Sequence, residues 1–457
     1  MNQPLCEPNC ILERIQKYFP SYVPPFYSYS SSIPTNHAIA MKYINLKQKE
    51  DFNKLIKVVE TNVPEGILSH HPAAKLYDIK VNSGYNQPDD YIYSNYPEIR
   101  ASIPRGFTIL QLSKENTEVV IYANKKFTGG TYDEDGQQQS GDWKTYFIKD
   151  LNEAKQVVAM TKINGEAGHF SARHIGGKFY IIAGSKNVHM IFNKREDIDL
   201  YCGDRYQVAR AVAICLYEKL TSMDENDCQL LLSLLHHTKS TAVCEILQPT
   251  NQHIVNLSSL QKPKLIFLAL TPPPIEYRNC FHDSLLAAPP HHCLSFIKSL
   301  GFECPTYKVL PIDQLLVHRN NIYKTVKEEG EVLYFLDNHD RTIGLVKAKT
   351  AWYIMLRALR EKFTKKNKHG GDILNSVSRR LKEIQAWLQF SDIYLNDWMN
   401  LATSFTQYLN EQAIPLGAPQ IRPNFPIYWD EFLSQNSLTD NFSLSDVNTK
   451  GWLEPKS

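Results

Sequence analysis

Long hydrophobic runs are absent from this sequence of 457 residues. Stretches such as "LIFLAL" at 265–270 have the length of a buried strand, whereas a membrane-spanning helix needs about 20 apolar residues. The opening residues "MNQPLCEPNC" lack the basic start and apolar centre of a secretory signal. We therefore expect no membrane span and no secretory leader.

A disulfide framework and a strong net charge are also missing. The nine cysteines are odd in number and lie scattered through apolar segments, which fits reduced thiols in an intracellular compartment, cytoplasmic or nuclear. Fifty Lys and Arg against 48 Asp and Glu give a formal net charge of +2. A nucleic-acid partner therefore has to be argued from local clusters of basic residues. The sequence gives no indication of oligomeric state.

Apolar residues are plentiful, and their periodicity predicts the fold class. Hydrophobic residues make up 43% of the chain, enough for two or three domains with their own cores. Short strand-like runs separated by turns fill 101–350, with a few helical stretches between them. From residue 351 the period becomes helical. We expect an α+β fold with mainly antiparallel sheets, followed by an all-helical C-terminal module.

The two ends of the chain have a different composition. Residues 1–100 are rich in Pro, Tyr, Ser and Asn, which predicts an irregular extension packed on the core through its aromatic side chains. The last forty residues, within the helical module of 351–457, return to Pro, Asn and Ser and predict a loosely held tail.

One lysine stands out in "MTKINGEAGHF", where Lys162 follows an apolar strand and precedes Gly165. A nucleophilic lysine must be unprotonated to attack. If its electrophile is a nucleoside triphosphate, it needs cations for the phosphates, carboxylates for Mg²⁺ and sugar, and a glycine where the backbone approaches the nucleotide. By itself, K-x-x-G is common at strand ends and turns.

Residues of these kinds recur in order along the chain. Upstream lie "IPRGFTIL" and "ANKKFTGG", and downstream lie "GSKNVHM", "CEILQPTNQHIV", "KEEGEVLYF" and "GLVKAKTAWY". Lys347 and Lys349 alternate along one strand, so they share a face and call for an anion.

This series resembles the ATP-dependent RNA ligases of the covalent nucleotidyltransferase superfamily, nearest to phage-type ligases and the ligase domain of fungal tRNA ligases. "KING" resembles their K-x-(D/N)-G element and "GSKNVH" the following S-K element. The most discriminating match is E-x-x-x-P-x-N-x-x-I-V, formed by Glu245, Pro249, Asn251, Ile254 and Val255. "EGEV" and "VKAKTAWY" resemble the last two elements, and the "RG" and "KF" pairs resemble the upstream phosphate contacts.

The resemblance implies a nucleotidyltransferase fold over 101–350 and a role for each matching residue. Lys162 would form lysyl-AMP; the nucleotide-binding residues would be Arg105, Lys126, Asn164, Gly165, Lys186, Glu245, Glu329, Lys347 and Lys349. Lys125 could take the place of Lys126. Among the nucleotide-binding residues, Glu329 would help to bind Mg²⁺ or Mn²⁺, and Glu245 would hold the ribose. Asn164 stands at the position where the phage enzymes have an acidic residue, and in this it agrees with the fungal enzymes. Thr128 stands where the phage enzymes have a second aromatic residue.

The implied reaction joins an RNA 5′-phosphate to an RNA 3′-hydroxyl with ATP, in RNA repair or tRNA splicing. A capping guanylyltransferase or DNA ligase would use the same lysine chemistry but normally continues into an OB-type β-domain, whereas helices are expected here. A third possibility is a non-catalytic RNA-binding protein on a ligase scaffold. The sequence retains every charged element, and this argues against that possibility.

Two histidine patterns suggest other chemistry. "HHT" at 236–238 and "HDS" at 282–284 resemble the paired H-x-T/S elements of RNA-end phosphodiesterases, but no P-loop accompanies them. We expect both matches to be coincidental. We therefore expect separate enzymes to prepare the RNA ends. "CFHDSLLAAPPHHCL" offers Cys280, His282, His291, His292 and Cys293 as zinc ligands, with a spacing that matches no known zinc motif.

A basic cluster follows the last lysine element. Its members are Arg357, Arg360, Lys362, Lys365, Lys366, Lys368, Arg379, Arg380 and Lys382. A solvated helical face is the plain interpretation, but RNA phosphates could neutralise the cluster, and we expect RNA contact there.

Overall fold

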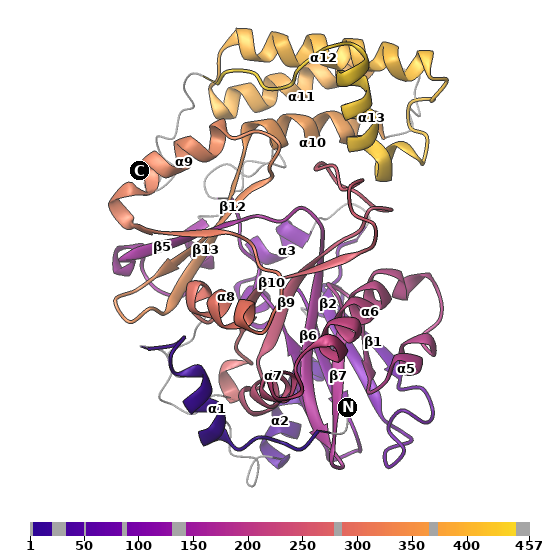
Figure 1. The fold of residues 1–457 in the computed structure, drawn as a ribbon, viewed down its shortest axis with the longest axis vertical. Helices are drawn as coiled ribbons and strands as arrows, with labels where there is room; N and C mark the ends of the chain where they lie inside the picture. Colours follow the sequence, from indigo (N-terminus) through magenta and orange to yellow (C-terminus); the bar gives the residue numbers. More distant parts are fainter. Residues whose placement is uncertain are drawn as a thin grey trace.

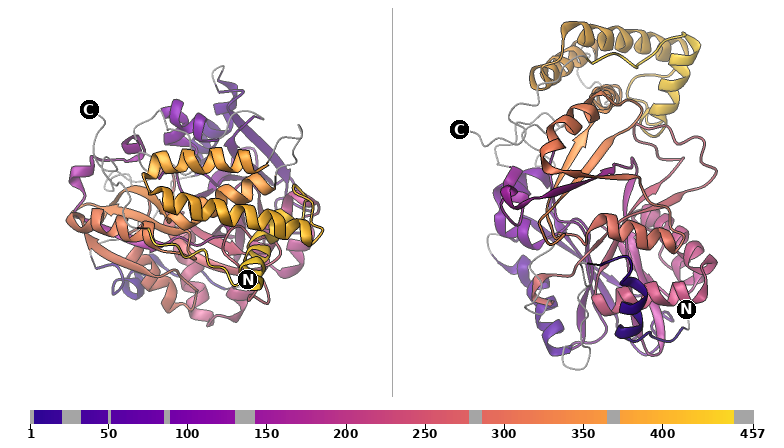
Figure 2. Two further views of the ribbon diagram at one scale, coloured as in Figure 1. Left: turned by 90° about the horizontal axis from the view of Figure 1, so that it is seen from above. Right: turned by 60° about the vertical axis from the view of Figure 1, so that its left-hand side comes forward.

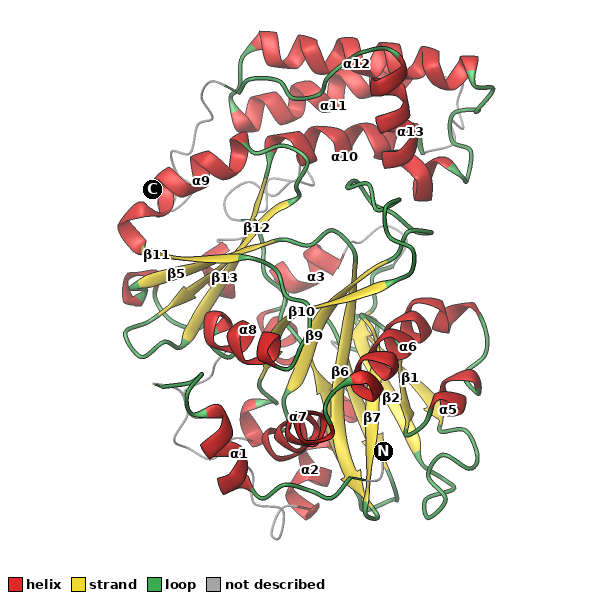
Figure 3. Ribbon diagram, viewed as in Figure 1, coloured by secondary structure: helices red, strands yellow, loops and turns green. Residues whose placement is uncertain are grey.

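The computed structural model describes residues 3–20, 33–49, 52–84, 89–129, 143–277, 286–364 and 373–444. Over these residues the fold is α+β with antiparallel sheets and a helical C-terminal region, as predicted. Figures 1 and 3 show the part of the chain that contains all the described strands, called the body below, at one end of the long axis and the C-terminal helices at the other. The right-hand view of Figure 2 shows the same separation from another side.

The described strands form three antiparallel sheets. The N-terminal sheet has the order β1(Ile56–Asn62), β2(Lys75–Val81), β3(Phe107–Gln111), β4(Thr117–Tyr122). The central sheet has the order β10(Lys264–Thr271), β9(Thr241–Leu247), β6(Glu166–Ile175), β7(Lys178–Ser185), β8(His189–Phe192). The hairpin sheet has the order β11(Tyr307–Pro311), β5(Gln156–Thr161), β12(Gly330–Leu336), β13(Thr342–Lys349).

Helices cover these sheets. Those of the body are α1(Pro8–Ile15), α2(Ile33–Ile44), α3(Asp89–Asn95), α4(Pro97–Ser102), α5(Arg195–Asp199), α6(Gln207–Ser222), α7(Glu225–Thr238), α8(Pro290–Ser299) and α9(Leu315–Lys324). Helices α6 and α7 pack on the central sheet, and α9 packs on the hairpin sheet. Their apolar faces are buried in the central and hairpin-sheet cores.

The prediction of an irregular extension over 1–100 is wrong for most of the described residues in that range. Strands β1 and β2 pair with each other and then with β3, so one sheet runs across residue 100. The stretches "IKVVETN" and "KLYDIKV" carry the strand-forming residues. This part of the chain is integral to the body.

The C-terminal helices are α10(Ala351–Phe363), α11(Ile373–Leu388), α12(Asp392–Glu411) and α13(Ile421–Gln435). Helix α13 overturns the expectation of a loose tail over its own length. Phe425, Trp429 and Phe432 follow each other at helical spacing and are buried, and this apolar face outweighs the internal Pro426. Ile254, from the loop after β9, is buried in the same core. The helical module is therefore packed directly against a loop of the body.

No helix among the described residues combines the length and the apolar character that crossing a membrane requires.

Candidate active site

Lys162 lies at the end of β5, beside the start of β12. Its backbone N–H donates to the carbonyl of Gly330 at 2.7 Å, and its Nζ lies 2.9 Å from Oε1 of Glu329. Because β5 and β12 are paired in register, with Thr161 opposite Glu331, the motif lysine and the motif glutamate come from adjacent strand ends. The structure thus brings together two residues that are 167 positions apart in the sequence.

Asn164 connects Glu329 to the loop after β9. Its Nδ2 donates to Oε2 of Glu329 at 2.6 Å. Its Oδ1 accepts hydrogen bonds from the backbone N–H groups of Ile254 and Val255, both at 3.0 Å. One amide side chain therefore fixes the Ile-Val end of the most discriminating motif and orients the carboxylate that pairs with Lys162.

Gly165 is required for close backbone approach. Its N–H donates to Oε1 of Glu245 at 3.1 Å. A Cβ at this position would lie 2.5 Å from the carbonyl oxygen of Ile246, which is shorter than any normal contact. The chain can therefore pass β9 at this distance only with a glycine.

The two lysines of β13 also reach this site. Lys349 is buried, and its Nζ lies 3.8 Å from Oε1 of Glu329 and 5.0 Å from the centre of the Tyr353 ring. Lys347 lines the same cavity as Lys162. Both lysines converge on the surroundings of Lys162, as their alternation predicts.

The three remaining cations lie near one another and are matched by two acidic residues that sequence reasoning missed. Asp89 Oδ2 lies 3.1 Å from Nη2 of Arg105 and 2.9 Å from Nζ of Lys186. Lys126, which is buried, pairs with Asp90. Both aspartates belong to the first turn of α3. None of the sequence elements quoted above includes either aspartate. The only signal for them in the sequence is the acidic pair in "QPDDYIY".

A cavity of about 560 Å³ joins these groups, a size typical of small-molecule sites. Its lining includes Arg105, Lys162, Gly165, Lys186, Glu245 and Lys347. Phe127 and Tyr334 add aromatic surface, and His253 adds an imidazole. Four other candidate residues are buried and do not belong to that lining, namely Lys126, Asn164, Glu329 and Lys349. The cavity therefore has a cationic wall, the half-buried carboxylate of Glu245 and apolar surface.

Burial and charge set the protonation states around Lys162. Burial would lower the pKa of Lys162, but Glu329 and Glu245 outweigh it, so the pKa is raised above its ordinary value. For Glu329, burial is outweighed by Lys162 and Lys349, and the pKa is lowered. Burial raises the pKa of Glu245 to about 7. Lys162 is thus a protonated partner of Glu329 in the free protein.

A buried relay of three side chains reaches the wall of the cavity. His169 lines the cavity, and its Nδ1 lies 3.2 Å from Nε2 of His189. Nδ1 of His189 in turn lies 2.9 Å from Oδ1 of Asp78. These residues come from β6, β8 and β2. His169 and His189 stand in the stretches "MTKINGEAGHF" and "GSKNVHM", but the sequence assigned no role to either. The relay links the N-terminal sheet to the wall of the cavity.

The alternative histidine patterns have structural explanations where the chain is described. Nδ1 of His236 accepts a hydrogen bond from the backbone N–H of His174 at 3.0 Å, and Thr238 Oγ1 donates to the carbonyl of Leu234. The "HDS" triplet, Cys280 and His282 lie outside the described residues. Cys293 is buried in the hydrophobic core, where burial raises the pKa of its thiol to about 12. Cys293 is also not part of the group of potential metal ligands found among the described residues.

The basic cluster after β13 is not a uniform solvated face. Arg360 is buried and donates to the backbone carbonyls of Arg422, at 3.0 Å, and Gln252. The expectation that it contacts RNA is therefore wrong, because its guanidinium is used between the helical module and the loop after β9. Arg357 and Arg380 pair with Glu361 and Glu383 on their own helices. Arg379 and Lys382 are exposed on α11, while Lys365, Lys366 and Lys368 lie outside the described residues.

The chain belongs to the family described as Domain of unknown function (DUF7920), which matches residues 81–360. That range contains every candidate site residue predicted from the sequence. No curated protein matches the chain.

Solved structures similar to this one include RNA ligases. An archaeal ATP-dependent RNA ligase (form 1) matches with a TM-score of 0.44 and 11% identity, covering 79% of this chain and 79% of that chain. A Naegleria gruberi RNA ligase variant with ATP and Mn matches with a TM-score of 0.31 and 14% identity, covering 46% of this chain and 54% of that one. A second such variant with ATP and Mn gives 0.30 and 15%, covering 46% and 55%. This chain thus spans about half the length of the Naegleria ligase chains.

Proposed function

We propose that this protein is an ATP-dependent RNA ligase that joins an RNA 5′-phosphate to an RNA 3′-hydroxyl, in RNA repair or tRNA splicing. The observation that carries the proposal is the convergence of Lys162, Glu245 and a set of cations on one cavity of about 560 Å³, where Lys162 pairs with the buried Glu329. Attack of an amine on the α-phosphorus of ATP depends mainly on positioning and on neutralising charge, and these residues supply both.

The proposed reaction has three steps. The amine of Lys162 attacks the α-phosphorus, so that an N–P bond forms, the bond to pyrophosphate breaks, and the amine loses its proton. A 5′-phosphate oxygen of RNA then attacks the AMP phosphorus and releases Lys162. Finally, the 3′-hydroxyl of RNA attacks the 5′-phosphate, which forms the phosphodiester and releases AMP.

Each charged group has a proposed role in the first step. Lys347 and Lys349 would neutralise the α-phosphate, and Arg105, Lys126 and Lys186 would bind the β- and γ-phosphates. Glu245 would hold the ribose through its second carboxylate oxygen, because Oε1 already accepts from Gly165. Asn164 would keep Glu329 and the Ile254 loop in register.

Glu329 is suited to Mg²⁺ or Mn²⁺, because a hard cation takes carboxylate oxygen together with water and substrate phosphates. An ion bound there would supply charge neutralisation for the phosphates and compete with Lys162 for the carboxylate. Glu329 holds Lys162 protonated in the free protein. Weakening that ion pair would lower the pKa of the amine and prepare it for attack.

The decisive experiment is a covalent-adduct assay. The protein is incubated with Mg²⁺ and either α-labelled ATP or α-labelled GTP, then denatured and separated by size. We expect a labelled adduct with ATP that is lost in Lys162→Ala. A matched control is Lys308→Ala, since Lys308 is an exposed lysine on β11, paired with the same strand β5 that leads into Lys162.

Other outcomes have distinct meanings. An adduct with GTP alone would support a capping guanylyltransferase, and an adduct that persists in Lys162→Ala would contradict the assigned nucleophile. Absence of any adduct would favour a non-catalytic RNA-binding protein. Joining assays with 5′-phosphorylated RNA, 5′-hydroxyl RNA and 5′-phosphorylated DNA then establish the substrate, and sealing of 5′-hydroxyl RNA would contradict our expectation that separate enzymes prepare the ends.

A further inference from the structure

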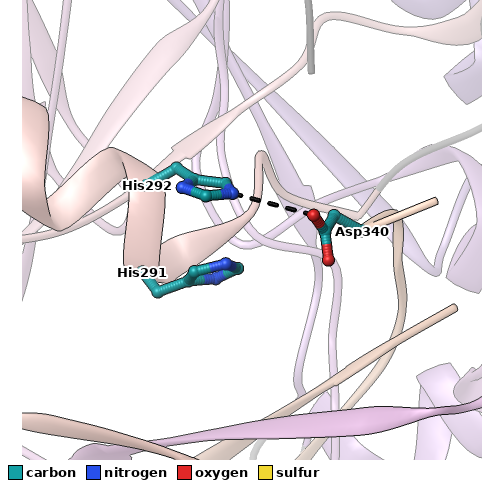
Figure 4. A group of neighbouring side chains, drawn as sticks. All are labelled: His291, His292 and Asp340. Carbon is teal, nitrogen blue, oxygen red and sulfur yellow. Dashed lines mark ion pairs between the residues drawn. The ribbon is translucent and has the colours of Figure 1, made fainter. Parts of the chain in front are cut away.

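A second group of chemically active side chains lies away from the proposed active site. His291 and His292 belong to the first turn of α8, and Asp340 belongs to the turn between β12 and β13. One potential ligand atom from each of the three lies within 4.8 Å of the others, the one such group found in the described part of the chain. Figure 4 shows the two imidazoles and the carboxylate gathered between the helix and the turn.

We propose that His291, His292 and Asp340 bind a divalent transition-metal ion, with Zn²⁺ as the first candidate, and that this ion fastens α8 to the β12–β13 turn. Two imidazoles and one carboxylate are a ligand set that Zn²⁺ accepts with an additional water. Imidazole nitrogen does not suit Mg²⁺, which prefers oxygen. The ion would therefore differ from the one proposed at Glu329.

The spacing of the groups supports a shared ion. Nε2 of His292 lies 3.7 Å from Oδ2 of Asp340, which is longer than a hydrogen bond. Two ligands on a tetrahedral Zn²⁺, with bonds of about 2.0–2.1 Å, lie roughly 3.3 Å apart. The imidazole rings of His291 and His292 are 3.9 Å apart between centroids, so both rings occupy the same side of the helix.

The two histidines also have buried nitrogen atoms without hydrogen bonds. Nδ1 of His291 and Nε2 of His292 are both buried, and neither has a hydrogen-bond partner among the described residues. Burying a polar atom without a partner costs free energy, and most such atoms in proteins are satisfied. A metal ion between the rings and Asp340 would satisfy both nitrogens at once.

Asp340 is held in position by its neighbours. It adopts a left-handed backbone conformation with φ of 58°, which Asp tolerates better than most residues. Gln156, on the adjacent strand β5, donates from Nε2 to Oδ1 of Asp340 at 2.5 Å. A carboxylate hydrogen-bonded in this way presents its other oxygen in a fixed direction, as the outer partners of metal ligands commonly do.

The location suggests what the ion would stabilise. The segment leading into α8 already contacts two sheets, because Ala288 N donates to the carbonyl of Leu270 in the central sheet and Leu286 N donates to that of Thr342 in the hairpin sheet. The opposite ends of β12 and β13 carry Gly330, next to Glu329, and Lys349. An ion at the turn would hold these strands against the sheet that carries Glu245.

The test measures metal content and binding in the full chain. Wild type is stripped with a chelator, loaded with Zn²⁺, dialysed and analysed by mass spectrometry for metal; Co²⁺ is then titrated while the visible absorption of a tetrahedral complex is followed. We expect wild type to retain about one more Zn²⁺ per chain than His292→Ala or Asp340→Ala. Gln156→Ala should weaken binding about 10–100-fold, as is usual for loss of an outer partner.

His318→Ala is the matched control. His318 Nε2, on α9, lies 2.6 Å from Oε2 of Glu331 on β12. This variant therefore removes another histidine–carboxylate pair, one that has no third potential ligand among the described residues. It should retain metal like wild type. Zn²⁺ should also raise the melting temperature of wild type and His318→Ala but not that of Asp340→Asn, which keeps the size of the side chain.

Equal zinc content and equal thermal shifts in wild type, His292→Ala and Asp340→Asn would overturn the proposal, as would failure of wild type to retain Zn²⁺. These readouts do not depend on lysyl-AMP formation. The site can therefore be established or rejected whatever the outcome of the adduct assay.

Discussion

Gly165 is a residue of the candidate site at which the backbone passes too close to strand β9 for a side chain. In Gly165→Ala the new Cβ would meet the carbonyl oxygen of Ile246 at 2.5 Å and Cγ of Glu245 at 3.0 Å. The backbone would have to move, which displaces Lys162 from its partner Glu329. Since misplacement by about 1 Å can cost roughly 100-fold in rate, we expect lysyl-AMP formation to fall by at least that factor in single-turnover measurements.

Gly177→Ala provides the control for this substitution. Gly177 has a φ of 80° and open space around its missing Cβ, so alanine there should cost about 1 kcal/mol of stability without affecting adduct formation. Adduct formation at the wild-type rate in Gly165→Ala would show that the loop adapts and that the close approach is not required.

Glu245 makes stability depend on pH. Burial raises its pKa from 4.5 to about 7, so between these values the folded protein binds a proton that the unfolded chain has released. Stability therefore falls as pH rises through this window and is lowest above the folded pKa. Glu245→Gln, which retains an acceptor for Gly165 N–H, should be more stable than wild type at pH 8 by about 1–3 kcal/mol and nearly equal to it at pH 4.5.

Urea denaturation of both proteins across this range measures the difference directly. The same gap at both pH values would contradict the assignment of the titration to Glu245. A raised Michaelis constant for ATP in Glu245→Gln is expected as well, because the proposed ribose contact loses its charge.

The residues that the sequence could identify are those whose chemistry is written in a local pattern. Lys162, Gly165 and Lys349 stand in short motifs whose order is informative, and the structure brings them together. Asp89 and Tyr353 could not be assigned roles in the same way, because each contributes through a partner distant in sequence: Asp89 through Lys186, and Tyr353 through a 3.3 Å contact with Nδ2 of Asn164. Tertiary pairing, not local pattern, determines their role.

At the scale of elements, α3 supplies the acidic partners of Arg105, Lys126 and Lys186. Burial would raise the pKa of Asp89, but Arg105, Lys126 and Lys186 lower it far below its ordinary value, so this carboxylate stays charged and competes with phosphate. In Asp89→Asn the competing charge is gone. We expect ATP to bind about fivefold more tightly, corresponding to about 1 kcal/mol, and the free protein to lose about 1–2 kcal/mol of stability as the cations lose their partner.

Isothermal calorimetry with ATP in the Lys162→Ala background measures this affinity without turnover. Asp199→Asn is the control, since Asp199 also pairs with two cations, Arg195 and Arg210, but is itself exposed on α5. Weaker ATP binding in Asp89→Asn would show instead that the aspartate positions Arg105 and Lys186 for the phosphates.

Elements differed in how well their sequences predicted them. Strands with continuous apolar runs, such as β5 and β13, were expected from their composition and are confirmed. Strand β6 was not recognised, because "EAGHFSARHI" interrupts its apolar residues with buried Arg173 and two histidines. Arg173 is accommodated because Glu118 of β4 pairs with it at 3.2 Å and the carbonyl of Val119, also on β4, accepts a hydrogen bond from it at 2.8 Å. Its burial therefore depends on a neighbouring strand that local periodicity does not reveal.

At the scale of the whole molecule, the helical module is joined to the site through a loop. Ile254 lies in the module's core, its backbone N–H donates to Asn164, and Arg360 holds Gln252. These contacts fix the module's position relative to the site, so under the proposed function it would present RNA to the cavity from a fixed position. Arg379 and Lys382 are exposed on α11 and are candidates for phosphate contact.

We expect the double variant Arg379→Ala/Lys382→Ala to bind single-stranded RNA more weakly and with a smaller salt dependence. Each phosphate contact contributes about 0.7 to the slope of log K against log salt for single strands, so losing two should reduce the slope by about 1.4. Lysyl-AMP formation from free ATP should not change, since neither residue lines the cavity. Binding measured by fluorescence anisotropy at several salt concentrations, alongside the adduct assay, separates the two effects.

Arg380→Ala on the same helix distinguishes phosphate contact from helix stability. Arg380 pairs with Glu383 at 3.2 Å, so its charge is already matched and its removal should change the slope much less. If all three substitutions reduce RNA affinity equally while the salt slope stays constant, their effect comes from α11 itself. RNA phosphates would then have to be bound elsewhere on the molecule, and the cationic wall of the cavity would be the next surface to vary.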